Sequence, residues 1–298
     1  MDLARLKTLR ELANRETMAA VATALHMTPS GVSQQIAQLE DEAGVALTER
    51  HGRRVKLTHA GNVLVAHVER MLSVLDEARS DLADIRNEIA GTLRIAAFAT
   101  AAAALLPQVM HVLRKSYPRL QVILVEMEPA QGLTALGSRD VDIAIVDDLS
   151  LKLASLEKSV SQVFLLEDEL RVALTRGHRL SKKEAIDLID LKHEEWALDS
   201  AHSFYGEFII DLCERAGYFP RINAECQGSE IIAAMVSSGC SISVIPALRV
   251  SQMPANVLTV SLRPRAKRRI LAVFRRGDKR HPAIKVFLAE LEHAARHR

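Results

Sequence analysis

The stretch "ATALHMTPSGVSQQIAQLE", residues 22–40, joins an alanine- and leucine-rich helical pattern to a Thr-Pro-Ser-Gly interruption and a row of glutamines. Proline disrupts the interior of a helix, because it lacks an amide hydrogen and clashes with the preceding turn, but it fits the first turn. Pro29 is therefore expected to begin a new helix, with Thr28 as its N-cap residue. The stretch predicts two short helices that meet across a few residues.

The helix expected from Pro29 onward has an apolar face and an uncharged polar face. Val32, Ile36 and Leu39 recur at helical spacing and predict the buried side. The opposite side and its flanks carry small hydrogen-bonding residues: Ser30, Ser33, Gln34 and Gln38. Glutamine can bond adenine through both of its polar atoms, and a helix-turn-helix enters the major groove with the start of its second helix. A plain solvent-exposed helix pair is the alternative at this point.

The segment "ERHGRRVKLTHAG", residues 49–61, follows directly. Short strand-like runs flank His51 and Gly52, which predicts a β-hairpin with Arg53 and Arg54 at its tip. A basic hairpin beside a recognition helix is typical of a wing that contacts phosphates or the minor groove. Its position after the helix pair favours this interpretation over a solvated run of charges.

A long helix is expected from residue 59 to residue 90, capped by Thr58 and ended by Gly91. Its apolar residues follow a heptad pattern with a period of 3.5: Leu64, Val68, Met71, Leu75, Ala78, Leu82, Ile85 and Ile89. Such a narrow stripe favours a dimer seam, although it could instead pack on the chain's own domain. A dimer would hold two recognition helices about one DNA turn or a multiple apart, and so would require a roughly two-fold symmetric site.

From residue 92 onward strand-like and helix-like runs alternate, as in "TLRIAAFA", "LQVILVEM" and "VDIAIVDD", which predicts an α/β fold. Ligands of open α/β sheets bind at the carboxyl ends of strands, near helix N-termini. This rule selects the following candidates: Thr100, Glu128, Asp147, Ser200, His202, Phe204, Gln227 and Ser229.

Each candidate also has an ordinary structural interpretation. Thr100 and Ser229 could cap helices, Phe204 could belong to the core, and His202 could lie on the surface. Glu128 and Asp147 could form salt bridges or favour a cationic ligand, whereas helix N-termini favour anions. The charge of the ligand is therefore left open.

Composition limits the remaining possibilities. The chain has 298 residues, of which 48% are hydrophobic and 26% charged, and its formal net charge is +2. The longest nearly apolar run, residues 95–106, is shorter than the roughly 20 residues of a membrane span. The three cysteines have no metal-like spacing and favour a reducing cytoplasm over disulfides. Neither a nucleophile elbow nor a phosphate-binding glycine loop is present, so we expect no enzyme, cofactor, metal or membrane association.

A basic cluster occupies residues 263–280, where nine basic residues accompany one acid, Asp278. We interpret it as a solvated face. A second DNA contact, made when DNA bends around an oligomer, is the alternative, and Arg275 and Arg276 would carry it.

Together these features resemble the LysR-type transcriptional regulators. The resemblance rests on the order of motifs across the chain, including "MAAVATALHMTPSGVSQQIAQLEDEAGVAL", "TLRIAAF", "LLPQVMHVLRKSYP", "DVDIAIVDD" and "MVSSGCSISVIPA". It implies an α/β protein with an N-terminal winged helix-turn-helix, a long linker helix and a two-lobed, periplasmic-binding-protein-like (type 2) effector domain. The small-molecule site of that family lies at the strand ends selected above.

The resemblance also implies which residues contact DNA: Thr28, Pro29, Ser30, Ser33, Gln34, Gln38, Arg50, Arg53 and Arg54. Two positions depart from the family pattern. Gln34 stands where arginine is common, so adenine is expected in place of guanine. Thr48 stands where phenylalanine is usual, so looser local packing is expected.

The resulting prediction is a cytoplasmic, DNA-binding transcriptional regulator that acts as a dimer or tetramer. Its partners are double-stranded DNA, at an interrupted palindrome, a small-molecule effector and other copies of itself. Residues 1–58 would form the DNA-binding domain, 59–90 the linker, and 91–298 the effector domain, with lobe I at 91–162 and 268–298 and lobe II at 163–267. The competing functions are a receptor whose head binds protein and a non-specific architectural DNA-binding protein.

Overall fold

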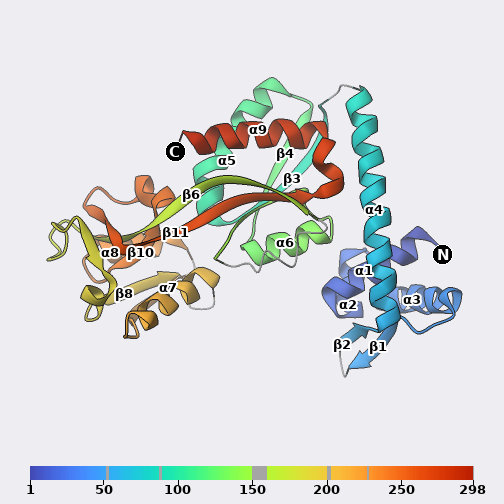
Figure 1. Cartoon of the computed structure of the whole chain (residues 1–298), viewed down its shortest axis with the longest axis horizontal. Helices are drawn as coiled ribbons and strands as arrows, with labels where there is room; N and C mark the ends of the chain where they lie inside the picture. Colours follow the sequence, from blue (N-terminus) through green and yellow to red (C-terminus); the bar gives the residue numbers. More distant parts are fainter. Residues whose placement is uncertain (52–53, 87–88, 150–159, 200–202, 227, 298) are drawn as a thin grey trace.

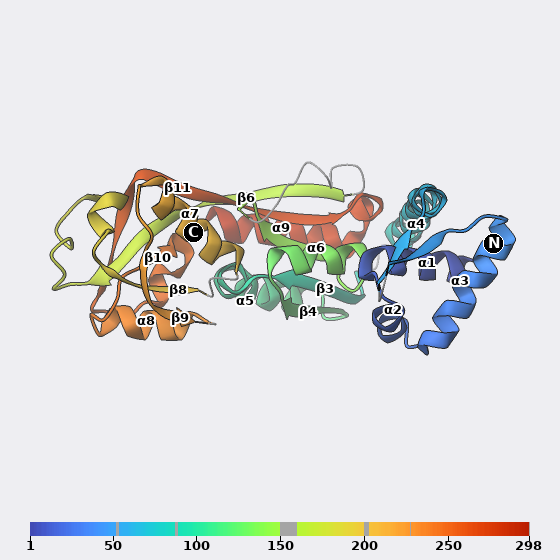
Figure 2. The same ribbon diagram turned by 90° about the horizontal axis from the view of Figure 1, so that it is seen from below.

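The computed structural model describes residues 1–51, 54–86, 89–149, 160–199, 203–226 and 228–297. Figures 1 and 2 show an elongated molecule in three parts: an N-terminal head at one end, a central lobe I, and a lobe II at the other end. A long helix, α4, leaves the head and runs beside lobe I.

The head packs helices around one small core and adds a hairpin. Its elements are α1 (Leu3–Arg15), α2 (Met18–Ala24), α3 (Pro29–Ala43), β1 (Thr48–His51) and β2 (Arg54–Leu57). Pro29 is the first residue of α3, and the Thr28 hydroxyl accepts a hydrogen bond from the Gly31 amide at 3.1 Å. Val32, Ile36 and Leu39 are buried, so the predicted start and buried face of this helix are confirmed.

The hairpin is held to α3 through Glu40. One carboxylate oxygen of Glu40 accepts hydrogen bonds from the amides of Leu47 and Thr48, at 2.8 and 2.9 Å, and from the Thr48 hydroxyl at 3.0 Å. Thr48 therefore joins the hairpin to α3 through two hydrogen bonds, whereas the sequence suggested only looser packing at this position. β1 and β2 pair antiparallel, with His51 opposite Arg54, which confirms the predicted hairpin over the described residues.

The long helix α4 spans His59–Arg86 and is N-capped by Thr58, whose hydroxyl accepts from the Gly61 amide at 3.0 Å. Two predictions need correction here. Val68 is buried in the head core, with Leu64 packed beside it, because the start of α4 covers the head. These two residues therefore serve their own domain. Gly91, expected to end the helix, instead begins β3 (Gly91–Ala97) with a φ of 101°.

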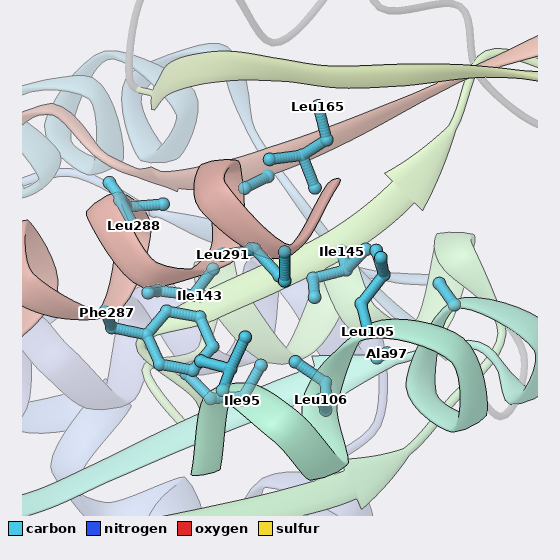
Figure 3. Packing of buried hydrophobic residues seen from close by; sticks show 14 of the residues in the cluster. Ile95, Ala97, Leu105, Leu106, Ile143, Ile145, Leu165, Phe287, Leu288 and Leu291 are labelled. Carbon is cyan, nitrogen blue, oxygen red and sulfur yellow. The ribbon is translucent and has the colours of Figure 1, made fainter. Parts of the chain in front are cut away.

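Lobe I is a sheet covered by helices on both faces. Its elements are β3, α5 (Ala99–Ser116), β4 (Leu120–Glu126), α6 (Pro129–Gly137), β5 (Ile143–Asp147) and the C-terminal α9 (Pro282–Arg296). β3 is parallel to both β4 and β5. Figure 3 shows the larger core, in which Phe287 and Leu291 of α9 pack with Ile95, Ile143 and the helix α5.

Lobe II has its own core around Trp196. Along the chain, its helices α7 and α8 alternate with short strands. Its elements are β7 (Ala185–Asp187), β8 (Glu195–Asp199), α7 (Phe204–Arg215), β9 (Arg221–Cys226), α8 (Ser229–Ser237), β10 (Ser243–Pro246) and 3-10 turns at Leu188–Leu191 and Ala247–Gln252. β8 and β9 are parallel.

Two long strands connect the lobes. β6 (Val160–Thr175) and β11 (Val257–Arg275) are antiparallel neighbours and extend from one lobe into the other, as Figure 1 shows. β11 pairs with β5 in lobe I, and β6 pairs with β10 in lobe II. A further 3-10 turn, Arg276–Arg280, follows β11 and leads into α9.

The head also contacts lobe I directly. The guanidinium of Arg15 in α1 pairs with Asp140 at 2.9 Å, and Arg10 donates to the carbonyl of Ser138 at 3.2 Å. None of the helices in the described ranges is both long and apolar enough to cross a membrane.

Gly61 sets the distance between α4 and the hairpin. A Cβ atom at this position would lie 2.1 Å from the carbonyl oxygen of Leu47, which belongs to the backbone. Gly61→Ala should therefore force the elements apart and lower the free energy of unfolding by about 1–3 kcal/mol, as overpacking does. Urea denaturation with hydrogen exchange over residues 44–64 measures the effect.

Gly137, at the end of α6, is the matched control because a Cβ there meets nothing within 4 Å. Gly137→Ala should change stability by no more than about 1 kcal/mol. Equal effects of the two substitutions would contradict the proposed steric constraint.

Candidate functional site

The first candidate surface lies at the start of α3. Thr28, Pro29 and Ser30 are exposed at its N-terminus, and so are Ser33, Gln34 and Gln38 along the side opposite the buried face. This row of six exposed, uncharged residues offers hydroxyl and amide groups, which can donate to and accept from base edges. The fold thus brings together all the residues of α3 that the sequence selected.

The hairpin stands next to this row. Arg50 lies in β1 and Arg54 in β2, on paired strands, whereas Arg53 lies outside the described residues. Guanidinium groups on such a hairpin suit phosphate binding, because their charge is permanent and their donors form a fork.

The second candidate site is the interlobe junction, which we define by Thr100, Asp147, Asp168, Tyr205 and Arg268. Asp147 ends β5, Thr100 lies in the first turn of α5, and Tyr205 lies in the first turn of α7. Asp168 and Arg268 are opposite each other where β6 and β11 cross between the lobes. Thr100 and Asp147, two of the candidates that the strand-end rule selected, therefore lie at this junction.

Arg268 is the centre of the junction and is only 3% exposed. Its Nη2 atom lies 2.9 Å from Asp168 Oδ2, and its Nη1 atom lies 3.2 Å from Asp147 Oδ2. Nη2 also donates to the Thr100 hydroxyl at 2.8 Å. The guanidinium carbon lies 4.8 Å from the centre of the Phe98 ring and 5.7 Å from that of Tyr205. One cation thus binds groups from both lobes.

The structure changes the interpretation of several residues that the sequence selected as effector contacts. Asp147 is buried in an ion pair with Arg268, which is the salt-bridge alternative. Thr100 and Ser229 are not helix caps, because Phe98 and Gly228 are the N-cap residues of α5 and α8. Phe204 is exposed at the start of α7 and lies outside the core. Ser200, His202 and Gln227 lie outside the described residues.

Glu128 is the N-cap residue of α6, beyond the end of β4, and its amide donates to Gln131 at 3.4 Å. Partial burial raises the pKa of the Glu128 carboxyl, and the carboxylates of Asp199 and Asp147 raise it further, while Arg268 opposes the shift. Additional negative charge is therefore unfavourable next to Glu128.

The interpretation of residues 263–280 as a solvated face is wrong for two of its members. Arg268 is buried, as described, and Arg275 pairs with Asp142 at 2.9 Å and with Asp278 at 2.7 Å. Arg275 thus holds the end of β11 against lobe I, so the alternative role of a free DNA contact does not suit it. Arg269 and Arg276 are exposed.

Sequence reasoning also missed Arg268, Asp168 and Tyr205 as parts of the junction. A usable signal was present: in the two-residue period of a strand, Arg268 is in phase with Ile270 and Ala272, both buried in the lobe I core. An arginine on the apolar face of a strand indicates a buried ion pair.

Replacing Arg268 by methionine should leave two buried carboxylates without their counter-charge. Arg268→Met is therefore expected to lower the free energy of unfolding by about 3–5 kcal/mol, the usual effect of breaking a buried ion pair. Urea denaturation of the full chain measures the loss.

Arg269→Met is the matched control, because Arg269 is exposed and stacks over the Phe164 ring at 5.3 Å. That change should cost less than about 1 kcal/mol. A similar small effect of both substitutions would show that Arg268 does not hold the junction.

Along the described part of the chain, no group of three or more histidine, cysteine, aspartate or glutamate side chains is arranged to hold a metal ion. The described geometry thus offers a helix with an exposed polar face beside a basic hairpin, and a two-lobed domain with a buried ion network at the junction of its lobes.

Comparison with known proteins matches both parts. The family described as bacterial regulatory helix-turn-helix protein, lysR family, matches residues 3–62. The family described as LysR substrate binding domain matches residues 86–296.

Curated relatives cover most of the chain. The transcriptional dual regulator GltC of Bacillus subtilis is 28% identical over 246 residues, which is 83% of this chain and 81% of GltC. The DNA-binding transcriptional dual regulator OxyR of Escherichia coli is 27% identical over 282 residues, or 93% of this chain and 90% of OxyR.

Solved structures have the same fold. A full-length OxyR variant from Pseudomonas aeruginosa has a TM-score of 0.70 at 23% identity and covers 98% of this chain and 94% of its own. Full-length BenM has a TM-score of 0.58 at 25% identity, with 100% and 96% covered. CbnR in complex with its target DNA has a TM-score of 0.54 at 23% identity, with 99% and 100% covered. The chain is therefore a member of the LysR family, a DNA-binding transcriptional regulator with an effector-binding domain and not an enzyme.

Proposed function

We propose that this regulator reads an interrupted palindrome as a dimer or tetramer, and that a small-molecule effector bound between its lobes controls it. In this proposal residues 1–58 are the reading head, 59–90 the linker and 91–298 the effector domain. The exposed polar row at the start of α3 is the observation that carries the proposal, because five side chains with hydroxyl or amide groups that suit base edges lie together there, at Thr28, Ser30, Ser33, Gln34 and Gln38. A cytoplasmic location accords with DNA as its partner.

We assign base contacts to Ser30, Ser33, Gln34 and Gln38, and backbone contacts to Thr28, Pro29 and the hairpin arginines. Gln34 lies on the exposed side of α3, near the N-terminal turns that a recognition helix presents to the major groove. Its amide suits adenine. The arginines of the hairpin supply affinity that depends on salt but not on sequence.

Dimerisation is assigned to the part of α4 beyond the head. Met71, Leu75, Leu82 and Ile85 are exposed along it, and the exposed fractions of Leu82 and Ile85 are 58% and 79%. Large apolar side chains in a row on one helix indicate a partner helix. A second copy of α4 meets this requirement and pairs two heads.

The effector is assigned to the strand ends around the interlobe junction, including Thr100, Glu128 and Ser229. A ligand that favours one orientation of the lobes would shift the relative placement of the heads, and with it the bend or occupancy of DNA. Arg268 contacts Asp147 of lobe I, Asp168 of the connecting strand and the Tyr205 ring of lobe II, so a ligand bound beside it would act on contacts that join the lobes.

Gln34→Ala should lower the affinity for the preferred DNA site by roughly tenfold to a hundredfold and relax the choice of base at one position. Footprinting upstream of the chain's own gene locates the site, and fluorescence anisotropy measures the affinity. The control is Gln121→Ala, another exposed glutamine, on β4.

In the same assay, replacing both Arg53 and Arg54 by alanine should weaken binding to every sequence and reduce the salt slope by up to about 2. An unchanged footprint with Gln34→Ala would refute the assigned reading head. Binding without any preferred site would favour an architectural protein, and no DNA binding at all would favour a protein-binding head.

A double substitution, Leu82→Glu with Ile85→Glu, should convert the assembly to monomers, because it places charges in an apolar seam. Sedimentation velocity reports the mass. Ile189→Glu, at an exposed apolar residue of lobe II, is the control and should leave the mass unchanged. Full-size assemblies from the double variant would show that α4 is not the dimer seam.

A further inference from the structure

Two arginines are buried near the interlobe junction, and their surroundings differ sharply. Arg268 is neutralised by two carboxylates and a hydroxyl, as described above. Arg249, in the 3-10 turn that follows β10, is only 8% exposed, yet it forms no hydrogen bond or ion pair with any residue of the described chain. Its Nε atom is fully enclosed without a partner.

An unpartnered guanidinium at this depth is unusual, because burying a charge is costly unless it is paired. Burial lowers the pKa of Arg249, and the distant charge of Arg268 adds to this effect, while Asp199 and Tyr205 oppose it. The carboxylate of Asp199 thus acts from a distance and does not reach the guanidinium. Arg249 therefore retains donors for a group that the described residues do not supply.

Arg249 lines a groove of about 670 Å³ between α8 and the 3-10 turn. This volume lies within the range of about 300–1,000 Å³ that is typical of small-molecule sites. Ser229 and Glu230, at the first turn of α8, line the same groove, as do Ser237 and Gln252. The groove therefore combines one buried cation with several neutral hydrogen-bonding groups.

The start of α8 adds a second attraction for negative charge. The amides in the first turn of a helix have no partner within the helix and carry a partial positive charge. The N-cap residue Gly228, with a φ of 117°, has no side chain to accept from them. Glu230 opposes an anion, but its side chain is exposed.

We propose that this groove is an oxyanion site, in which Arg249 pairs with a carboxylate, phosphate or sulfate group of a small molecule. The inference rests on the proposed effector function and adds the class of the effector. It places the anionic group against lobe II, away from Glu128, where negative charge is unfavourable.

Thermal unfolding of the full chain tests the binding step. Sodium phosphate, sodium sulfate and sodium succinate are compared with sodium chloride at matched ionic strength. At least one of these oxyanions should raise the melting temperature, since a ligand that binds only the folded state stabilises it. Arg249→Lys should retain the response, and Glu230→Gln should retain or strengthen it.

Arg249→Met should weaken oxyanion affinity by roughly ten- to a hundredfold, the usual range for a hydrogen bond to a charged group. In chloride alone, the same variant should melt at or above the temperature of the unmodified chain, because it removes an uncompensated buried charge. A response in Arg249→Met equal to that of the unmodified chain would overturn the proposal. So would the absence of a response to all three oxyanions in the unmodified chain.

The DNA footprint separates this inference from the proposed function. If an oxyanion binds through Arg249 and alters the footprint, both are supported. If it binds without altering the footprint, the site is supported but its effector role is refuted. If no oxyanion binds while specific DNA protection persists, the site is refuted and the DNA-reading function stands.

Discussion

The buried ion network of Arg268 is the interaction on which the two-lobed arrangement depends. A single guanidinium contacts Asp147 and Thr100 of lobe I, Asp168 on the connecting strand, and the Tyr205 ring of lobe II. Because every charge in it is buried, removing one member leaves the others uncompensated. The relative orientation of the two lobes therefore depends on a few specific contacts, and these lie where the ends of the strands meet.

The two exposed elements of the head, α3 and the hairpin, differ in the chemistry of their side chains. α3 presents neutral polar groups, whose donors and acceptors suit the edges of bases, while the cations of the head's hairpin suit phosphates. Glu40 joins these two elements by accepting three hydrogen bonds from residues 47 and 48, so the hairpin and the recognition helix hold a fixed relative position. The start of α4 packs over the head core, and the rest of α4 continues from there as the linker helix.

Local signals in the sequence predicted what depends on local structure. The cap at Thr28, the apolar face at Val32 and Ile36, and most strands of the α/β domain follow from periodicity and turn chemistry. The C-terminal helix α9 was not predicted, although its apolar residues recur at helical spacing. Partners far apart in the sequence were not predictable: Arg268 and Asp147 are separated by 121 residues, and only the tertiary fold brings them together.

The candidate effector site shows the same limit more strongly. The strand-end rule selected Thr100 and Asp147, which lie at the interlobe junction, but it could not separate a residue that is available to a ligand from one that is already paired, such as Asp147. The distinction between Arg268 and Arg249 depends on which carboxylates lie within reach, and no spacing rule contains that information.

The two connecting strands have a mechanical consequence. β6 and β11 are 16 and 19 residues long and stay paired through the crossing, where Asp168 faces Arg268 and Glu167 faces Arg269. The register shifts near Ser261 and Ile270 lie on either side of this crossing. A paired ribbon resists sliding, because sliding would break its ladder of hydrogen bonds, but it yields to torsion. Any change in the relative orientation of the lobes would therefore have to twist this two-stranded ribbon, whose Arg268–Asp168 pair lies between the two register shifts.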